Sequence, residues 1–596
     1  MCGIAGIFGW RGEGSELERR LARMQAALGH RGPDDRGLWI NQESTAGLCH
    51  TRLSILDLSA AGHQPMSTIS GRFEIAFNGE IYNYQSIRDR LEAAGQKFHS
   101  HGDTEVILNA YQQDGETCLT QFDGMFAFAI YDSAEKHGFL ARDPFGIKPL
   151  YYYTENGLTI FASELRTLLA SGLIEPKLCG RAVDSFLRCG SVQEPDTMIA
   201  GIQSLRPGTY LKWSESRVDV KEFAAIDFST STDGANAVER VGAAFHQTIR
   251  RHLVSDVPVG IFLSGGIDSS CIAKAVVQET SQPTQSYSIA LQDNAYNEAP
   301  IARRFAAELG TQHHEYLLRE EEIPTLFSEY LSSLDQPSID GFNTFCVSRF
   351  ARQQGAKVVL SGLGGDELFG GYGSFTRVPR LLDLSKRFYF GSPLLKLAGG
   401  ITESTITNSK GRRLGEWLQK SPSAENSYHL VRSIFSKKQA RHLQIVAGSN
   451  SPEEWIAPSP PHFSSVQDQV SYLELTGYMR NQLLKDSDVM SMAHGLELRV
   501  PLVDWEFFKT VSGVSPEIRF QRGKQLLVDA AGGLPDWITS PPKKGFLFPF
   551  EQWSNVLWKN SKPSIFDAHL GNNWPWYQRW ALRVLDDWMQ RYGVHA

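Results

Sequence analysis

Cysteine stands directly behind the initiator methionine, and this position gives the second residue two groups that can act together. If Met1 is removed, Cys2 carries a nucleophilic sulfur and a free α-amine, whose pKa of roughly 7.7–8.0 suits a general base. Such a residue could attack a carbonyl carbon and accept the proton that the attack releases. The small and apolar residues Gly3 to Phe8 predict a buried strand behind it. The alternative is an inert thiol on a core strand.

A second group of residues indicates phosphate chemistry. The apolar run Val259 to Leu263 leads into the turn S-G-G-I-D-S-S (264–270), and a helix is predicted from Ser269. Unpaired N–H groups and the positive end of the dipole at the start of a helix attract anions. The turn therefore predicts a site for the phosphates of a nucleotide, with Asp268 as a ligand for Mg²⁺.

A related turn, S-G-L-G-G-D-E-L-F-G-G-Y (361–372), follows the apolar run Lys357 to Leu360 and supplies Asp366. Both turns are expected at the carboxyl ends of parallel strands, where α/β sheets bind their ligands. Taken alone, either turn could be only a helix cap.

The elements around these residues change character along the chain. Up to residue 212, short apolar runs separated by turn residues predict antiparallel strands with a few helices. The polar stretch 213–235 is expected to be a linker, and strands alternate with helices from residue 236 onward. We therefore predict an α/β protein: an α+β antiparallel sandwich over 1–212, then a parallel-sheet domain over 236–596 with extra C-terminal helices. The Ser- and Pro-rich stretch 440–465 is expected to be a loop.

Composition restricts the class of protein. The chain has 596 residues, of which 41% are apolar and 21% charged, so two or more domains are expected. Its seven cysteines are scattered without a C-x-x-C spacing, which argues against a disulfide framework and a zinc site. A net charge of −7 argues against binding to nucleic acid, which is itself negatively charged. We expect a cytoplasmic protein, because neither a membrane span nor a signal peptide is evident.

Three further segments of the first half complete a pattern: His50 to Ile55, Phe77 to Asn83, and His101 to Glu105. With Cys2 and both glycine-rich turns, they make the chain resemble the asparagine synthetase family over essentially its full length. The resemblance implies a class II glutamine amidotransferase domain with the fold of N-terminal nucleophile hydrolases. An adenylating, ATP-pyrophosphatase synthetase domain would follow.

The resemblance also implies roles for individual residues of the first half. Cys2 would be the nucleophile, and the Asn78 side chain and the Gly79 amide would stabilise the oxyanion. Glutamine would be bound by Arg52, Asn78, Glu80 and Asp103. Taken singly, Arg52 and Asp103 could be surface ion pairs and Asn78-Gly79 a hairpin turn. Their order behind Cys2 favours the functional interpretation.

In the second half, Asp268 and Asp366 would hold Mg²⁺, and one of the adjacent Lys543 and Lys544 would reach the phosphates. Segments 478–488 and 492–504 would close the pocket of the acceptor, with Glu497 and Arg499 as candidate contacts. The implied ATP contacts are Leu263, Ser264, Gly265, Gly266, Asp268, Ser269, Ser270, Ser288, Ser361, Gly362 and Lys544.

One residue departs from the family pattern. Asparagine-forming members commonly have a glutamate where this chain has Leu363, and leucine can neither accept a proton nor hold a charge. We expect glutamine- and ATP-dependent amidation of a carboxylate, releasing AMP and pyrophosphate, with aspartate as the favoured acceptor. Another carboxylate, in surface-polysaccharide or secondary-metabolite biosynthesis, stays open as the acceptor.

Two other classes of protein are weighed against this function. A β-lactam-forming synthetase has no use for glutamine hydrolysis, so the intact set of glutamine residues argues against it. A non-catalytic regulatory protein on the same fold would be expected to lose some of the nucleophile or phosphate residues. The expected partners are small molecules (glutamine, ATP and the acceptor), without nucleic acid or membrane, and a homodimer is an open possibility.

Overall fold

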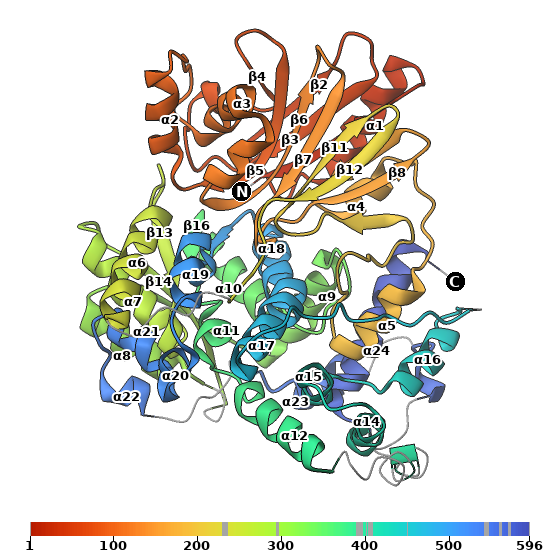
Figure 1. Cartoon of the computed structure of the whole chain (residues 1–596), viewed down its shortest axis with the longest axis vertical. Helices are drawn as coiled ribbons and strands as arrows, with labels where there is room; N and C mark the ends of the chain where they lie inside the picture. Colours follow the sequence, from red (N-terminus) through yellow and green to blue (C-terminus); the bar gives the residue numbers. More distant parts are fainter. Residues whose placement is uncertain are drawn as a thin grey trace.

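The computed structural model describes residues 2–594 except 229–235, 294–296, 389–396, 398, 401, 403–408, 450, 541–547, 559–562 and 570–573. Figure 1 shows strands of antiparallel sheets in the upper half, coloured red to yellow, and a helix-rich lower half. The lower half contains a parallel sheet. The predicted fold class, an α+β sandwich followed by an α/β parallel sheet with extra helices, is confirmed.

The strand behind Cys2 lies inside the first sheet. β1 (Gly3–Phe8) pairs antiparallel with β3 on one side and β9 on the other, and all of its residues are buried. Helices α1 (Gly14–Ala27) and α4 (Leu165–Ala170) pack on this sheet. The strand order is β10–β8–β9–β1–β3–β2, with bounds Ile202–Ser204, Tyr151–Glu155, Leu158–Ala162, Gly3–Phe8, Ala46–Arg52 and Asp35–Ile40.

The second sheet stacks on the first through a buried layer that includes Ile4, Phe8, Ala76 and Leu140. Its outer face is covered by α2 (Tyr84–Ala93) and α3 (Asp103–Asp114), which completes a four-layer sandwich. The strand order is β12–β11–β7–β6–β5–β4, with bounds Arg217–Glu222, Thr209–Ser214, His137–Arg142, Gly124–Asp132, Phe73–Ile81 and Met66–Ser67.

The predicted linker is wrong at its start. β11 pairs with β7, and β12 pairs with β11, so the chain stays in the second sheet until Glu222. β12 is an edge strand whose Arg217 and Lys221 are exposed, and this polar composition is also that of a linker. Part of the remaining stretch, 229–235, lies outside the described residues.

The parallel sheet brings the two glycine-rich turns together. β13 (Val259–Phe262) lies between β14 (Gln285–Leu291) and β16 (Val358–Leu360), and each turn follows one of these strands. The sheet order is β15–β14–β13–β16–β17, with β15 at Gln312–Leu318 and β17 at Glu497–Arg499. The helices around it include α6 (Ala237–His252), α7 (Ile267–Glu279), α8 (Ala299–Leu309), α9 (Ile323–Ser333) and α10 (Phe342–Gln353).

Further helices extend the second half below the sheet in Figure 1. The predicted loop at 440–465 is wrong at its start, because α16 continues to Val446 behind a capping box formed by Ser436 and Gln439. A π-helix, η5 (Glu474–Leu484), joins α17 to α18.

No helix within the described ranges is long and apolar enough to cross a membrane. The other α-helices are α5 (Gly180–Cys189), α11 (Gly365–Phe369), α12 (Ser374–Phe388), α14 (Ser409–Leu418), α15 (Ala424–Arg432), α16 (Lys437–Val446), α17 (Val466–Leu473), α18 (Lys485–Met492), α19 (Trp505–Ser512), α20 (Pro516–Arg519), α21 (Gln525–Ala530), α22 (Asp536–Thr539), α23 (Phe550–Leu557) and α24 (Trp576–Tyr592).

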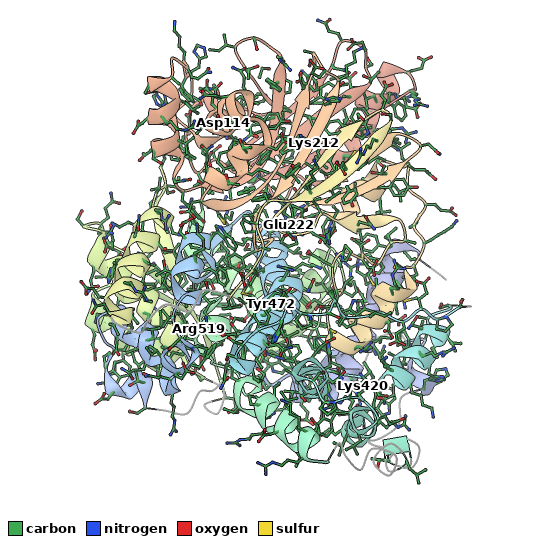
Figure 2. The ribbon with its side chains drawn as sticks, viewed as in Figure 1. Asp114, Lys212, Glu222, Lys420, Tyr472 and Arg519 are labelled. Carbon is green, nitrogen blue, oxygen red and sulfur yellow. The ribbon has the colours of Figure 1, made fainter. Side chains whose placement is uncertain are left out.

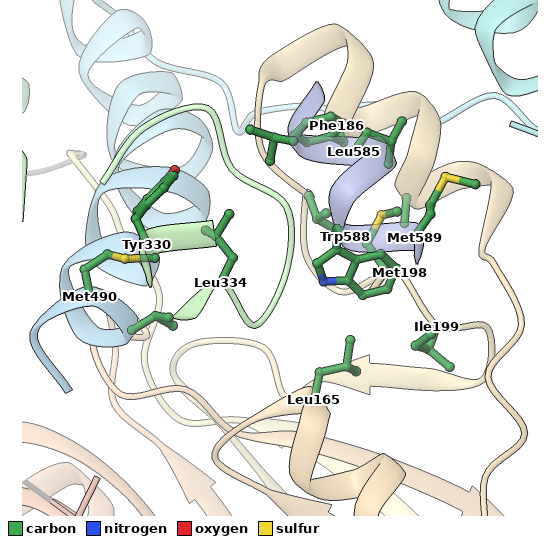
Figure 3. Close-up of a cluster of buried hydrophobic side chains, with 14 of the residues drawn as sticks. Leu165, Phe186, Met198, Ile199, Tyr330, Leu334, Met490, Leu585, Trp588 and Met589 are labelled. Atoms are coloured by element: carbon green, nitrogen blue, oxygen red, sulfur yellow. The ribbon is translucent and has the colours of Figure 1, made fainter. Parts of the chain in front are cut away.

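A shared apolar core joins the two halves of the molecule (Figure 3). Leu165, Phe186 and Met198 of the first half lie in one buried cluster with Tyr330 and Trp588 of the second. The Trp588 indole N–H also donates to the carbonyl of Asp335 at 3.0 Å. Because Trp588 belongs to α24, the final helix of the chain fills the space between the halves.

Candidate active sites

Cys2 is held at its backbone from both sides. Its N–H donates a 2.9 Å hydrogen bond to Oδ1 of Asn78, and its carbonyl accepts from Nε of Arg31 at 3.0 Å. Burial raises the pKa of the Cys2 thiol, although the charge of Arg52 opposes the shift. A thiol of raised pKa needs a base when it attacks. The Cys2 nitrogen that is hydrogen-bonded to Asn78 becomes such a base when removal of Met1 leaves it as a free α-amine.

Asn78 and Gly79 on β5 lie beside Cys2: the Asn78 side chain accepts from the Cys2 N–H, and Gly79 lines the same cavity as Cys2. Asn78 is fully buried, and its Nδ2 has no hydrogen-bond partner among the described residues. Gly79 adopts a φ of 154°, and a Cβ atom there would overlap the carbonyl oxygen of Met125. A buried unpaired amide costs about 1–3 kcal/mol, a cost that a ligand oxygen can offset. The two residues are therefore suited to an oxyanion.

A small cavity of about 30 Å³ opens beside Cys2. Arg52, Glu80 and Asp103 line it. The two terminal nitrogens of Arg52 donate to three backbone carbonyls of the loop 56–59. A guanidinium has five N–H groups, so Nε and one further N–H are left for a ligand. The structure thus brings together the residues predicted for glutamine.

The two acids of this cavity have perturbed pKa values. Burial raises the pKa of Asp103 to about 7, although its Oδ2 accepts from the Ile81 N–H at 2.9 Å. Burial also raises the pKa of Glu80, while Arg499, whose Nη2 lies 3.4 Å from a Glu80 oxygen, opposes that shift. A substrate ammonium group beside Asp103 would favour its charged form.

Glu497 and Arg499 were predicted in the acceptor pocket, and this placement is wrong. Arg499 reaches Glu80, and its Nε donates to Glu497 at 2.6 Å, so both lie beneath the Cys2 cavity. Alternate residues of a strand face the same side of a sheet, and only Leu498 between them lines the large cavity of the second half. The carbonyl of Arg499 accepts from the N–H of Ser361, which links the two regions directly.

The two glycine-rich turns touch each other at the ends of β13 and β16. The hydroxyl oxygens of Ser264 and Ser269 lie 3.0 Å apart, and the Gly266 N–H donates to Ser264 Oγ at 3.3 Å. Gly265 has a φ of 79°, which favours glycine. A Cβ on Gly362 would lie 2.8 Å from the Ser269 nitrogen, so the second turn packs directly on the first.

Lys524 joins the two predicted metal ligands. Its Nζ donates to both carboxylate oxygens of Asp268, at 2.6 and 2.5 Å, and also pairs with Asp366. Although burial opposes the shift, these carboxylates raise the pKa of Lys524. No predicted motif included this residue. The available signal was the basic turn Arg522–Lys524 just before helix α21.

The donor set of these two carboxylates fits Mg²⁺, which prefers hard oxygen ligands. Within the described part of the chain, no group of three or more His, Cys, Asp or Glu side chains is arranged around a common metal position. Two carboxylates would therefore need phosphate oxygens and water to complete an octahedron. Such a site would form only when a nucleotide is bound.

A cavity of about 2570 Å³ extends from the turns to the first half of the molecule. Figure 2 labels one lining residue from each half, Glu222 and Tyr472. Leu363 is half-buried in its wall. The predicted ATP and metal residues that line the cavity are Leu263, Ser264, Gly265, Gly266, Asp268, Ser269, Ser288, Ser361, Gly362 and Asp366.

One predicted ATP contact is not in this wall, and another falls outside the described residues. Ser270 is fully buried outside the cavity, because it follows Ser269 on α7 and successive side chains of a helix point about 100° apart. Lys544, with its neighbour Lys543, falls in the segment 541–547, outside the described residues. Their contacts to phosphate stay predictions.

Comparison with known proteins agrees with this geometry. Residues 1–224 match the glutamine amidotransferase domain family, and residues 240–568 match the asparagine synthase family. Asparagine synthetase (glutamine-hydrolyzing) 1 of Bacillus subtilis (strain 168) is 32% identical over 568 residues, covering 93% of this chain and 88% of that protein. The chain belongs to the asparagine synthetase family.

Other known proteins resemble this chain to a similar extent. A putative asparagine synthetase (glutamine-hydrolyzing) of Mycobacterium bovis is 32% identical over 588 residues, covering 93% of this chain and 88% of its own length. Amidase chry2 of Gibberella zeae is 27% identical over 617 residues, covering 94% and 90%. This member is thus a glutamine-hydrolysing ligase with an amidotransferase and a synthetase domain.

The synthetase domain also contains an acid close to Leu363 in sequence. The Tyr372 hydroxyl lies in the cavity wall and donates to Glu367 at 2.8 Å. Burial and the neighbouring Asp366 raise the pKa of Glu367 to about 8. Near neutral pH this carboxyl group is largely protonated, so it can exchange a proton through Tyr372 where Leu363 cannot.

Proposed function

We propose that this asparagine synthetase family member amidates aspartate with nitrogen from glutamine. The products are asparagine, glutamate, AMP and pyrophosphate. The observation that carries the proposal is the pair of acidic glycine-rich turns that meet around Lys524 in the wall of a cavity that reaches the amidotransferase domain. The names of the asparagine synthetases that it resembles support aspartate as the acceptor.

In the amidotransferase domain, the Cys2 sulfur attacks the side-chain carbonyl carbon of glutamine while the α-amine accepts the thiol proton. Arg52 pairs with the substrate carboxylate and Asp103 with its ammonium group. Asn78 Nδ2 and the Gly79 N–H donate to the oxyanion. The tetrahedral intermediate then collapses: the α-ammonium returns the proton to the leaving nitrogen, ammonia departs, and a thioester is left, which water hydrolyses to glutamate.

In the synthetase domain, a carboxylate oxygen of the acceptor attacks the α-phosphorus of ATP, and pyrophosphate leaves. Ammonia then attacks the acyl carbon, and AMP leaves. Asp268 and Asp366 would hold Mg²⁺, which supplies positive charge to the phosphates when bound. The backbone around Gly265 and Gly266 and the ammonium of Lys524 bind phosphate oxygens. A homodimer and a cytoplasmic location stay predictions.

A different carboxylate acceptor is the second candidate. Leu363 is apolar where asparagine-forming relatives commonly have glutamate, and a cavity of about 2570 Å³ is far larger than aspartate requires. A bulkier or less charged acid would fit both observations.

The test combines the purified protein with glutamine, MgATP and millimolar aspartate. We expect aspartate-dependent AMP and asparagine in equal amounts. AMP formation that does not respond to aspartate, in a preparation that hydrolyses glutamine, would transfer the function to another carboxylate.

A further inference from the structure

One half-buried arginine in the wall of the large cavity, Arg480, has no partner among the described residues. Arg480 lies on the π-helix η5 and lines the cavity. Within the described parts of the chain, its guanidinium donates no hydrogen bond and forms no ion pair, and its Nε is buried. π-Helices are uncommon and often occur at functional sites. The side chain therefore differs from an ordinary structural arginine.

The neighbouring cations are neutralised by acids. Arg432, also in the cavity wall, pairs with both carboxylate oxygens of Glu474, at 3.1 and 2.6 Å. Arg142 pairs with Glu194 at 2.9 Å. Glu194 is an acid that acts electrostatically on Arg480, but it forms no ion pair with it. Among the described residues, Arg480 thus differs from Arg432 and Arg142 in having no acid paired with it.

Burial makes this positive charge unfavourable when no anion is bound. It lowers the pKa of Arg480, and the charge of Arg142 adds to the shift, while Glu194 opposes it. The helix is fixed beside this position: Asn481 accepts from the Glu194 N–H at 2.9 Å and donates to Gln193 at 3.0 Å. The guanidinium is thus presented from a rigid support at the domain interface.

We propose that Arg480 binds a second, non-reacting anionic group of the acceptor, a carboxylate or a phosphate. The inference rests on the proposed adenylation of an acceptor in this cavity. A guanidinium offers parallel N–H groups that match the oxygens of either anion. The acceptor then carries two acidic groups: one is adenylated near Asp268 and Asp366, and the other is bound by Arg480.

The test compares acids that differ only in the second group. The matched pairs are aspartate with β-alanine, glutamate with 4-aminobutanoate, and succinate with butanoate, and 3-phosphonopropanoate replaces succinate to distinguish a phosphate-like group. AMP formation with an ammonium salt is measured for the wild type, Arg480→Met and Arg480→Lys. Arg206→Gln is the control, because Arg206 is an exposed arginine of the same cavity.

We expect the wild type to prefer the member with two acidic groups in at least one pair. Arg480→Met should lower kcat/KM for that acid by about 10- to 100-fold and change its one-acid counterpart by less than about threefold. Arg480→Lys should retain part of the preference, and Arg206→Gln all of it. If another acid with two acidic groups depends on Arg480 while aspartate gives no AMP, the anion site is supported and aspartate is removed from the proposed function.

Other outcomes overturn the inference. Equal losses for both members of a pair would make Arg480 a structural counter-charge to Glu194. AMP formation only from acids that have a single acidic group would contradict the anion site, although the proposed adenylation would still stand. If no acid is turned over, calorimetry with succinate and a non-hydrolysable ATP analogue decides: binding that Arg480→Met abolishes supports the site. Binding that is absent, or unchanged by the substitution, refutes it.

Discussion

The two candidate sites differ in how tightly the protein surrounds them. The Cys2 cavity has a volume of about 30 Å³, and most of its polar groups form hydrogen bonds with neighbouring residues. The synthetase cavity has about 2570 Å³, and Arg480 in its wall has no partner in the described part of the chain. A close-fitting site suits one invariable substrate, glutamine, whereas a wide site constrains the nucleotide and leaves the acceptor less defined. The amidotransferase chemistry can therefore be assigned more closely than the acceptor.

Removing the nucleophile should have the largest effect and would separate the two sites most clearly. Cys2→Ala should reduce glutamine-dependent AMP formation by at least about 10³-fold, because no other group in the small cavity can form the thioester. Activity with an ammonium salt should stay within about twofold of wild type, and Cys179→Ala is the matched control. Loss of ammonium-dependent activity as well would mean that the sites are not separable.

The opposite result, loss of synthetase activity with glutamine hydrolysis intact, should come from substitutions of Asp268 and Asp366. Asp268→Asn and Asp366→Asn should each lower pyrophosphate release by about 10²- to 10³-fold, since each removes a charge that holds Lys524 and the proposed Mg²⁺. Glutamine hydrolysis, measured as glutamate release, should persist. Asp89→Asn, at an exposed position on α2, should leave both activities unchanged. Equal loss of both activities in the Asp268 variant would contradict the assignment of the sites.

A smaller effect, a pH dependence of KM for glutamine, should appear only at the Cys2 cavity. The raised pKa of Asp103, about 7, means that this carboxyl group is mostly neutral below pH 7 and mostly charged above it. Since binding of the substrate ammonium needs the charged form, KM for glutamine should rise about tenfold from pH 8 to pH 6. Asp103→Asn should abolish this slope and raise KM at pH 8. A flat KM in the wild type would refute the role of Asp103.

The smallest effect should come from a substitution of Leu363 in the wall of the synthetase cavity. If Glu367 and Tyr372 supply the proton transfer that Leu363 cannot, Leu363→Glu should change aspartate-dependent AMP formation by less than about threefold, with Leu363→Met as control. If the wall is instead shaped for an apolar acceptor, the new carboxylate is buried unpaired and should cost several kcal/mol of stability. Steady-state kinetics and a thermal melt together distinguish these cases.

Residues that act within one local motif could be predicted from the sequence. Cys2, Asn78, Gly79 and Asp103 each stand in a short segment whose turn or strand is set by its own residues, and the structure gathers them around one small cavity. Likewise, the two glycine-rich turns follow predicted strands, and their adjacency follows from the parallel sheet.

The rest depended on contacts between distant segments. Lys524 reaches Asp268 only because the chain returns to the sheet after more than 250 residues, and no local pattern records that approach. Glu497 and Arg499 were misplaced because the face of a three-residue strand depends on its register with β16. The linker prediction began too early because an exposed edge strand and a linker share a polar composition.

Helix α24 has a consequence for the order in which the protein is made. Its Trp588 and Leu585 fill the core between α5 and the loop after α9, yet they leave the ribosome long after both of these elements. The antiparallel sandwich can fold early, but Phe186 and Leu165 lack part of their cover until this helix arrives. We expect nascent chains arrested before residue 576 to be cut by protease between the halves, while full-length chains resist. Synthesis thus delivers a folded nucleophile domain first and closes the contact between the two catalytic halves only when α24 emerges.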